Sequence, residues 1–107
     1  MANTFKNAHA QVGTGYSTVY TTPSATTTVI LAVSLCNTTT GTISVDVQFR
    51  DGGSTGRKIL TSVDIPAGST LEILSGQKYI LEATDDIQIK SDTASSLDVV
   101  MGVMEIT

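Results

Sequence analysis

The chain has 107 residues, of which 40% are hydrophobic and 15% charged, and its formal net charge at pH 7 is −4. This length suits one domain, over residues 1–107, and leaves no room for a second core. The acidic balance, with no basic run longer than Arg57-Lys58, argues against nucleic acid and anionic membranes as partners.

The chain as a whole is rich in Thr, Ser and Val and has few charged residues. Thr and Val are branched at Cβ, which suits a pleated strand better than a helix. No window of the sequence sustains the 3.6-residue period of an amphipathic helix, whereas several alternate with period two. The composition therefore predicts an all-β protein.

The first element of the chain, residues 1–12, contains only two sizeable apolar side chains, Phe5 and Val12. We expect it to be either a first strand or an N-terminal docking arm that lies off the core. Phe5 is a large side chain to leave in water, and His9 is expected to be a surface or interface imidazole. Phe5 and His9 are therefore the candidate assembly contacts.

Two strands are expected in the middle of the chain. Residues 29–36 (VILAVSLC) are apolar on both faces, as in a central strand that is covered on both sides or faces a partner. The thiol of Cys36, the sole cysteine, is expected to be a small buried hydrophobe. Residues 43–49 (ISVDVQF) alternate, which predicts that Ile43, Val45, Val47 and Phe49 enter the core.

Shorter alternating runs follow at residues 70–73 and 86–90, and a longer one spans residues 97–106. Turn-forming residues separate the runs, notably at 37–42, 51–56, 65–68 and 92–95. Strands of this length and spacing are typical of sandwiches. We therefore predict an antiparallel, jelly-roll-like β-sandwich of seven to nine short strands.

The sequence contains none of the residue combinations or spacings of the common catalytic and metal-binding motifs. His9 is the sole histidine, so neither an ordinary zinc site nor a Ser-His-Asp triad is expected. The loop at residues 52–58 lacks the spacing of a phosphate-binding loop. Asp85, Asp86 and Asp92 do not have the spacing of a calcium loop. We therefore expect a protein that is not an enzyme and has no catalytic, cofactor or metal site.

Several segments along the whole chain carry a resemblance to a known family. They are MANTFKNA at residues 1–8, TVYT at 18–21 followed by Pro23, CNTT at 36–39, IPAGSTLEIL at 65–74, LEATD at 81–85 and EIT at 105–107. In these the chain resembles small virion structural proteins of tailed bacteriophages, common in marine and cyanobacterial phages. The resemblance lies in these short segments and in their spacing along the chain, and it includes no active-site signature.

The resemblance implies a non-enzymatic virion component with a β-sandwich fold, made in the host cytoplasm. Its expected partners are the major capsid protein or other virion proteins, and copies of itself in a trimer or other symmetric homo-oligomer. A capsid decoration or cement protein is the favoured role, and a tail, neck or fibre-attachment component is the alternative. A carbohydrate-binding module also stays open, although the chain has no Trp and few other aromatic residues to stack on sugars.

Overall fold

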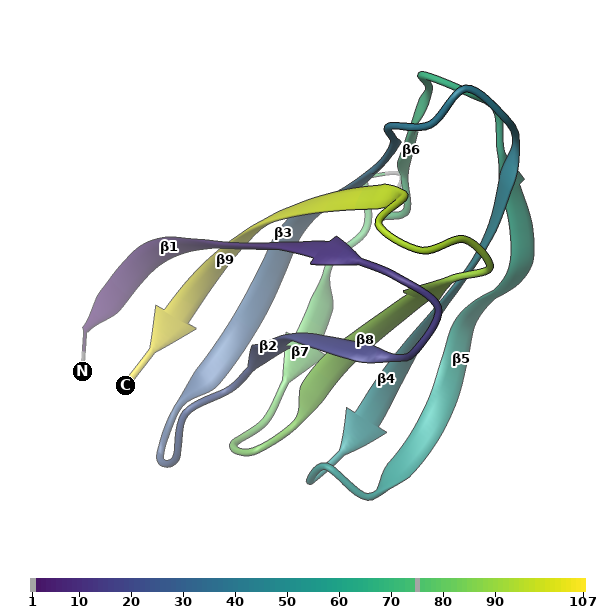
Figure 1. Cartoon of the computed structure of the whole chain (residues 1–107). Helices are drawn as coiled ribbons and strands as arrows, with labels where there is room; N and C mark the ends of the chain where they lie inside the picture. The colour runs from purple at the N-terminus through teal and green to yellow at the C-terminus, as the bar shows by residue number, and fades with distance from the viewer. Residues whose placement is uncertain (1, 75) are drawn as a thin grey trace.

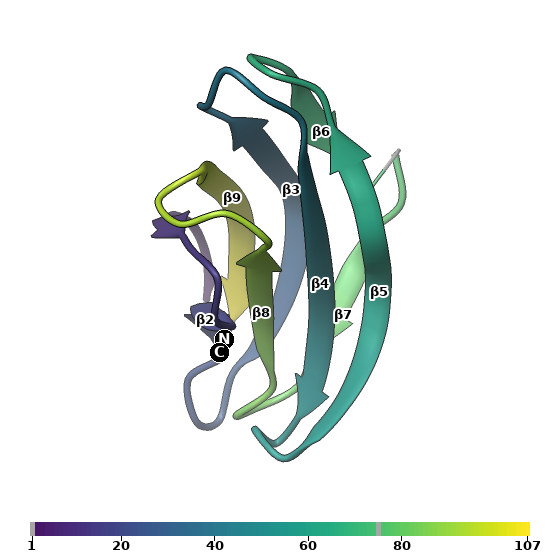
Figure 2. The same ribbon diagram turned by 45° about the vertical axis from the view of Figure 1, so that its right-hand side comes forward.

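The computed structural model describes residues 2–74 and 76–107, which form two facing antiparallel sheets (Figures 1 and 2). No helix occurs among the described residues, so none of them forms a helix that could cross a membrane. The described residues form nine strands: β1 (Asn3–Val12), β2 (Ser17–Thr21), β3 (Thr27–Asn37), β4 (Ile43–Asp51), β5 (Thr55–Ile65), β6 (Thr70–Glu72), β7 (Tyr79–Leu81), β8 (Asp86–Ser91) and β9 (Leu97–Ile106).

The strands pair like one long hairpin that has been folded over on itself. β4 pairs with β5, β3 with the short strands β6 and β7, β2 with β8, and β1 with β9. Folding this ribbon gives sheet A, in the order β1-β9-β3-β6 with β7 also on β3, and sheet B, in the order β2-β8-β4-β5. This nested pairing across two sheets is the jelly roll. The predicted all-β, jelly-roll-like sandwich is confirmed.

The core consists of apolar side chains that alternate inward from both sheets. In β4, Ile43, Val45 and Val47 are buried as their alternation predicts, with Val47 at 0% exposure. β9 buries its alternate residues from Leu97 to Val103 in the same way. Phe49 is only half-buried and lines a shallow apolar groove of about 260 Å³ near β7, because it stands where the facing edge of sheet A is a three-residue strand.

Strand β3 lies in the middle of sheet A, yet only one of its faces is covered by the chain. Its inner side chains, among them Ile30 and Leu35, are fully buried. On the other face Leu31 is 36% exposed and Cys36 is half-buried. The expectation that Cys36 is a buried hydrophobe is therefore wrong, because the alternation of the strand directs it to the outer face. The sequence left two environments open for this strand, covered on both sides or facing a partner. The exposure of Leu31 agrees with the second.

One buried polar side chain, Asn37, holds the end of the sandwich where β3 turns into β4. Its Nδ2 donates hydrogen bonds to the carbonyl oxygens of Gly41 and Ile65, both at 2.8 Å. Its Oδ1 accepts from the main-chain N–H of Thr39 at 2.9 Å and from the Thr39 hydroxyl at 2.8 Å. The side chain is fully buried, so both ends of the amide need these partners.

Candidate functional site

The outer face of sheet A, on the side away from sheet B, carries the exposed large hydrophobic residues of the described chain. They come from four strands: Phe5 of β1 is 73% exposed, Leu31 of β3 36%, Ile80 of β7 56% and Val100 of β9 57%. Single exposed apolar residues are ordinary, but a group on one face indicates a surface that binds something. We call this surface the apolar face.

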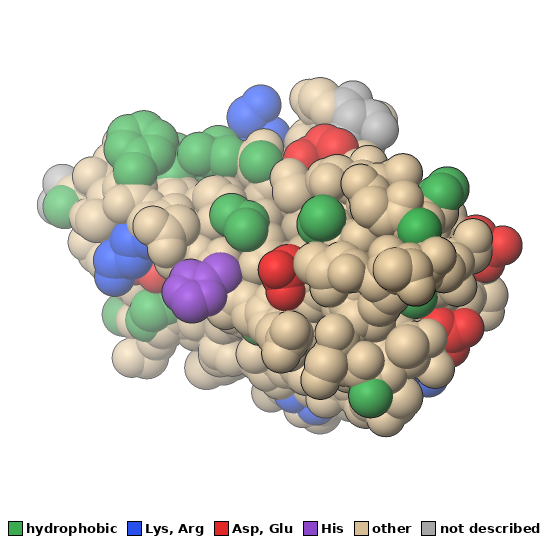
Figure 3. Space-filling view, turned by 45° about the horizontal axis from the view of Figure 1, so that its top comes forward, with side chains coloured by type: hydrophobic (Ala, Val, Ile, Leu, Met, Phe, Trp, Pro, Cys, Tyr) green, Lys and Arg blue, Asp and Glu red, His purple; other side chains and the backbone are tan. Residues whose placement is uncertain are grey.

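Strand register joins part of the apolar face into a row that crosses the sheet. Phe5 lies opposite Met104, Met104 opposite Val29, and Val29 opposite Ile80. Directly opposed side chains in an antiparallel sheet contact one another, so the row runs from the β1 edge to the β7 edge. Figure 3 looks onto a face of the molecule with hydrophobic side chains in view around the histidine.

His9, the second candidate contact, lies on the same face of β1 as Phe5, four residues further along the strand. It pairs with Val100 of β9. A shallow groove of about 340 Å³ lies here, lined by His9, Ala10, Gln11, Asp98, Val99 and Val100. The structure thus places both candidates on the apolar face beside the β1 edge, with a hollow next to His9.

Leu31, Ile80 and Val100 were not predicted as contacts. For Leu31 the signal existed, because residues 29–36 are apolar on both faces. Ile80 and Val100 each stand beside core residues in sequence, Leu81 and Val99, and a single strand pattern does not tell which apolar neighbour faces outward. Pairing within the sheet decides it.

A cluster of polar side chains joins strand β1 to β9 within sheet A, and joins sheet A to β2 of sheet B. The Lys6 ammonium lies 2.9 Å from Oε1 of Glu105, whose side chain is buried. The Tyr20 hydroxyl of β2 donates to Oε2 of the same carboxylate and lies 2.9 Å from the Thr28 hydroxyl. Residues 3–12 form a strand of sheet A through their pairing with β9, and their role in docking stays a prediction.

The contacts in this cluster shift the pKa values of Tyr20 and Glu105 in opposite directions. Burial, and then the hydrogen bond to Glu105, raises the pKa of Tyr20 to about 12. The hydrogen bond from Tyr20, followed by that from Lys6, lowers the pKa of the Glu105 carboxyl from its usual value of 4.5. A carboxyl with a lowered folded pKa stabilises the fold above its unfolded pKa and loses that contribution as it is protonated.

We expect Glu105→Gln to make the free energy of unfolding less dependent on acid pH. In the parent, this free energy should fall as pH drops below about 4.5 and through the lower folded pKa of Glu105. The variant should lose about 1 kcal/mol at neutral pH, because a charged acceptor becomes neutral. Urea unfolding at neutral and acid pH measures both effects. The exposed Glu82→Gln is the control, and parallel pH curves for all three proteins would contradict the expectation.

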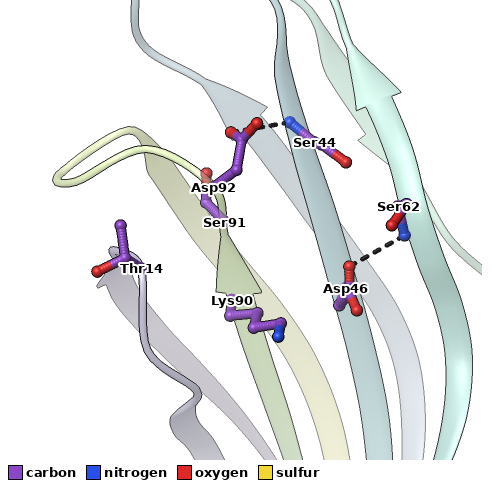
Figure 4. Close-up of a pocket in the computed structure, with 7 residues that line it drawn as sticks. All are labelled: Thr14, Ser44, Asp46, Ser62, Lys90, Ser91 and Asp92. Atoms are coloured by element: carbon purple, nitrogen blue, oxygen red, sulfur yellow. Dashed lines mark hydrogen bonds between the residues drawn. The ribbon is translucent and has the colours of Figure 1, made fainter.

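Sheet B presents a polar outer face with its own shallow groove, of about 290 Å³ (Figure 4). Two of its carboxylates are engaged by the main chain: Asp92 Oδ1 accepts from the N–H of Ser44 at 3.1 Å, and Asp46 Oδ1 from the N–H of Ser62 at 2.9 Å. The remaining lining residues are Thr14, Lys90 and Ser91. This carboxylate arrangement holds neighbouring strands together.

Tyr16 lies close to the same groove but does not offer a free aromatic platform. The ammonium groups of Lys58 and Lys90 lie 4.7 and 4.8 Å from the centroid of its ring, within the range of cation–π attraction. A sugar would have to displace these contacts before stacking on the ring. The groove therefore gives little support to a carbohydrate site.

The aspartates considered for calcium are engaged by the protein. The Asp85 carboxylate accepts from the N–H groups of Gly52 and Glu82, both at 2.9 Å. Asp86 binds the Arg50 guanidinium through both oxygens, at 3.0 and 2.7 Å. Within residues 2–74 and 76–107, no three His, Cys, Asp or Glu side chains are grouped so that they could hold a metal ion.

The chain is similar to solved structures in its fold and not in its sequence. No protein-family model matches it, and no curated protein does. Among solved structures, it is similar to a chain of Bacillus endospore appendages, described as a family of disulfide-linked pili, with 16% identity and a TM-score of 0.59 over 97% of this chain and 84% of that one. It is also similar to a chain of the acid-stable capsid structure of Helicobacter pylori bacteriophage KHP30, with 15% identity and a TM-score of 0.58 over 100% and 89%. At these identities the similarity is one of fold.

Proposed function

We propose that this chain is a non-enzymatic structural protein of a phage virion, a decoration or cement protein that binds the major capsid lattice. The observation that carries the proposal is the apolar face. Four large hydrophobic side chains, 36% to 73% exposed, lie on one outer surface of a sandwich whose other outer surface is polar. Such a surface gains free energy when a partner removes it from water.

Two further observations support an assembly role. The resemblance to small phage virion proteins extends along nearly the whole sequence. Two of the solved structures with a similar fold are a pilus and a phage capsid, which are both built from many subunits. Because a fold hosts many functions, the similarity supports the proposal and does not decide it.

A cement protein binds many equivalent sites on a lattice, so weak individual contacts add up to firm retention. An apolar face of this kind suits the task better than a deep pocket does, because its exposed side chains can contact a capsid surface directly. The same face could serve a component of the tail, neck or fibre attachment. The two roles differ in what the particle loses when the protein is absent.

We expect particles that lack this protein to keep a complete capsid and an attached tail but to burst more easily on heating or osmotic shock. Electron microscopy and the release of DNA during a temperature ramp measure these properties. If the particles instead lose their tails or fail to adsorb while the capsid is as strong as before, the tail role replaces decoration.

A surface variant tests the apolar face directly. Ile80→Lys places a charge at the β7 end of the row and should weaken rebinding to stripped particles about tenfold or more, since an ammonium must be desolvated in the contact. Thr61→Lys, at an exposed position on β5 of sheet B, carries the same charge and should rebind like the parent. Equal rebinding of Ile80→Lys and the parent would remove the apolar face from the proposal.

A further inference from the structure

The sandwich has four sheet edges, and three of them are protected against pairing with another chain. β2 has five residues, with an irregular register between Thr18 and Tyr20. β6 and β7 have three residues each. β5 is long, but its register shifts twice, Ser62 has a φ of 50°, and Arg57 and Lys58 are charged. Short strands, irregularities and charges are the means by which proteins block edge pairing.

The fourth edge, β1, has none of these protections. It is ten residues long and pairs with β9 residue by residue, without any shift in register. Its one Lys or Arg is Lys6, whose ammonium is held by Glu105. A long, regular and nearly uncharged edge is one that an added strand can extend.

The hydrogen bonds at the end of the ladder tell which main-chain groups of β1 are free. Ala2 and Thr107 exchange both of their hydrogen bonds, at 3.2 and 3.0 Å. Since bonded and non-bonded pairs alternate in an antiparallel ladder, the even-numbered residues of β1 bond to β9. The odd-numbered residues direct their N–H and C=O groups away from β9: Asn3, Phe5, Asn7, His9 and Gln11. The side chains of these five residues are all exposed.

We infer that two copies of this chain pair through β1, antiparallel about a two-fold axis at Asn7. The free N–H and C=O groups belong to odd-numbered residues, so each must lie opposite an odd-numbered residue of the second strand. When the axis passes through Asn7, all five odd-numbered residues of each strand are paired. Asn3 then lies opposite Gln11 of the other copy, Phe5 opposite its His9, and Asn7 opposite its Asn7. Five such pairs form about ten main-chain hydrogen bonds, as many as a typical protein interface contains. Neighbouring registers, centred on residue 6 or 8, lose one pair.

The side chains fit this register. Phe5 is 73% exposed. In this register it lies opposite His9 of the other copy, which lines the groove of about 340 Å³. Each Phe5 ring would lie against the imidazole and the hollow beside Val100 of the other copy. Aromatic cross-strand pairs of this kind stabilise a sheet. The pairing also brings no like charges together, because none of the five paired residues is Lys, Arg, Asp or Glu, and the one histidine lies opposite Phe5.

The pairing would join two copies of sheet A into one continuous sheet, with their apolar faces side by side on one surface. It supplies a self-contact for the assembly role, and in this respect it rests on the proposed function. The contact itself is a property of the isolated protein, so it can be tested without a particle.

Sedimentation of the purified chain tests the pairing. The parent should form a dimer, and Asn7→Lys should weaken it on the order of a hundredfold, because two ammonium groups would face each other at the axis. Thr61→Lys has the same charge on sheet B and should dimerise like the parent. A cooperative thermal unfolding transition in each variant shows that both are folded. A parent that stays monomeric up to its solubility limit, or an Asn7→Lys protein that dimerises like it, would overturn the inference.

Cysteine cross-linking tests the register. With Cys36 replaced by Ser, Asn7→Cys should form a disulfide-linked dimer on mild oxidation, since paired Cα atoms lie about 5.5 Å apart. Asn3→Cys alone should not, whereas Asn3→Cys combined with Gln11→Cys should. A dimer linked through Asn3→Cys alone would contradict the two-fold register.

The two proposals fail in different ways. If the parent dimerises through β1 but is absent from purified particles, the virion role is wrong and the pairing stands. If monomeric Asn7→Lys protein enters particles in normal amount and strengthens them like the parent, the virion role stands and the pairing plays no part in it.

Discussion

Replacing Val47 by Asp is expected to lower the free energy of unfolding by about 4 kcal/mol or more. Val47 has 0% exposure and lies in the middle of sheet B, opposite Leu60 of β5 and Ile89 of β8. A carboxylate at this position would be surrounded by apolar side chains from both sheets, with no cation or hydrogen-bond donor to pair with. Thermal and urea unfolding measure the loss.

The neighbouring Asp46→Asn is the matched control, because it changes one charge on the opposite face of the same strand. Asparagine keeps an oxygen that can accept the hydrogen bond from the N–H of Ser62. The change also removes the 3.6 Å ion pair with the half-exposed Lys58, and exposed pairs contribute little. A Val47→Asp protein as stable as Asp46→Asn would show that the register of β4 is wrong.

Asn37→Asp should destabilise the protein by about 3 to 5 kcal/mol, although the two side chains have nearly the same shape. The Nδ2 group that donates to the carbonyls of Gly41 and Ile65 becomes an oxygen that repels both. The substitution leaves the buried carbonyl of Ile65 without this donor and places a carboxylate beside the carbonyls of Ile65 and Gly41. The expected result is a large drop in melting temperature, which should be smaller at acid pH, where the new carboxyl is protonated.

The control for this prediction is Asn3→Asp, which adds the same charge at an exposed position of β1. It should unfold at nearly the same denaturant concentration as the parent. If Asn37→Asp and Asn3→Asp were equally stable, the amide of Asn37 would not hold the β3–β4 connection to the end of β5.

The polar and apolar outer faces give the sandwich two different surfaces, and this asymmetry has a consequence for its assembly. The apolar face can bind a partner by burial, while sheet B stays hydrated. The β1 edge lies at the border of the apolar face, so strand pairing between copies would cover Phe5 and His9 at the seam and leave Leu31 and Ile80 of both copies exposed on one surface. Self-association and binding to a lattice are therefore compatible on the same sheet.

The sequence by itself determines the β-class and much of the core. In residues 43–47 and 97–103 alternation assigns the buried side chains correctly, because a strand with one face in a core must place an apolar residue at every second position. The sequence also shows that the chain has one His and one Cys, so no site within a single chain uses two of either residue, whatever its fold.

Only the tertiary structure decides which strands are neighbours and which surfaces stay open. Val100 and Val99 are both apolar, but pairing with β1 and β3 turns Val99 into the core and leaves Val100 57% exposed. Cys36 is half-buried for the same reason. The free edge of β1 depends on its pairing with β9, more than eighty residues away. These properties arise from contacts between distant segments, and a local pattern holds no information on which distant strand will supply the partner.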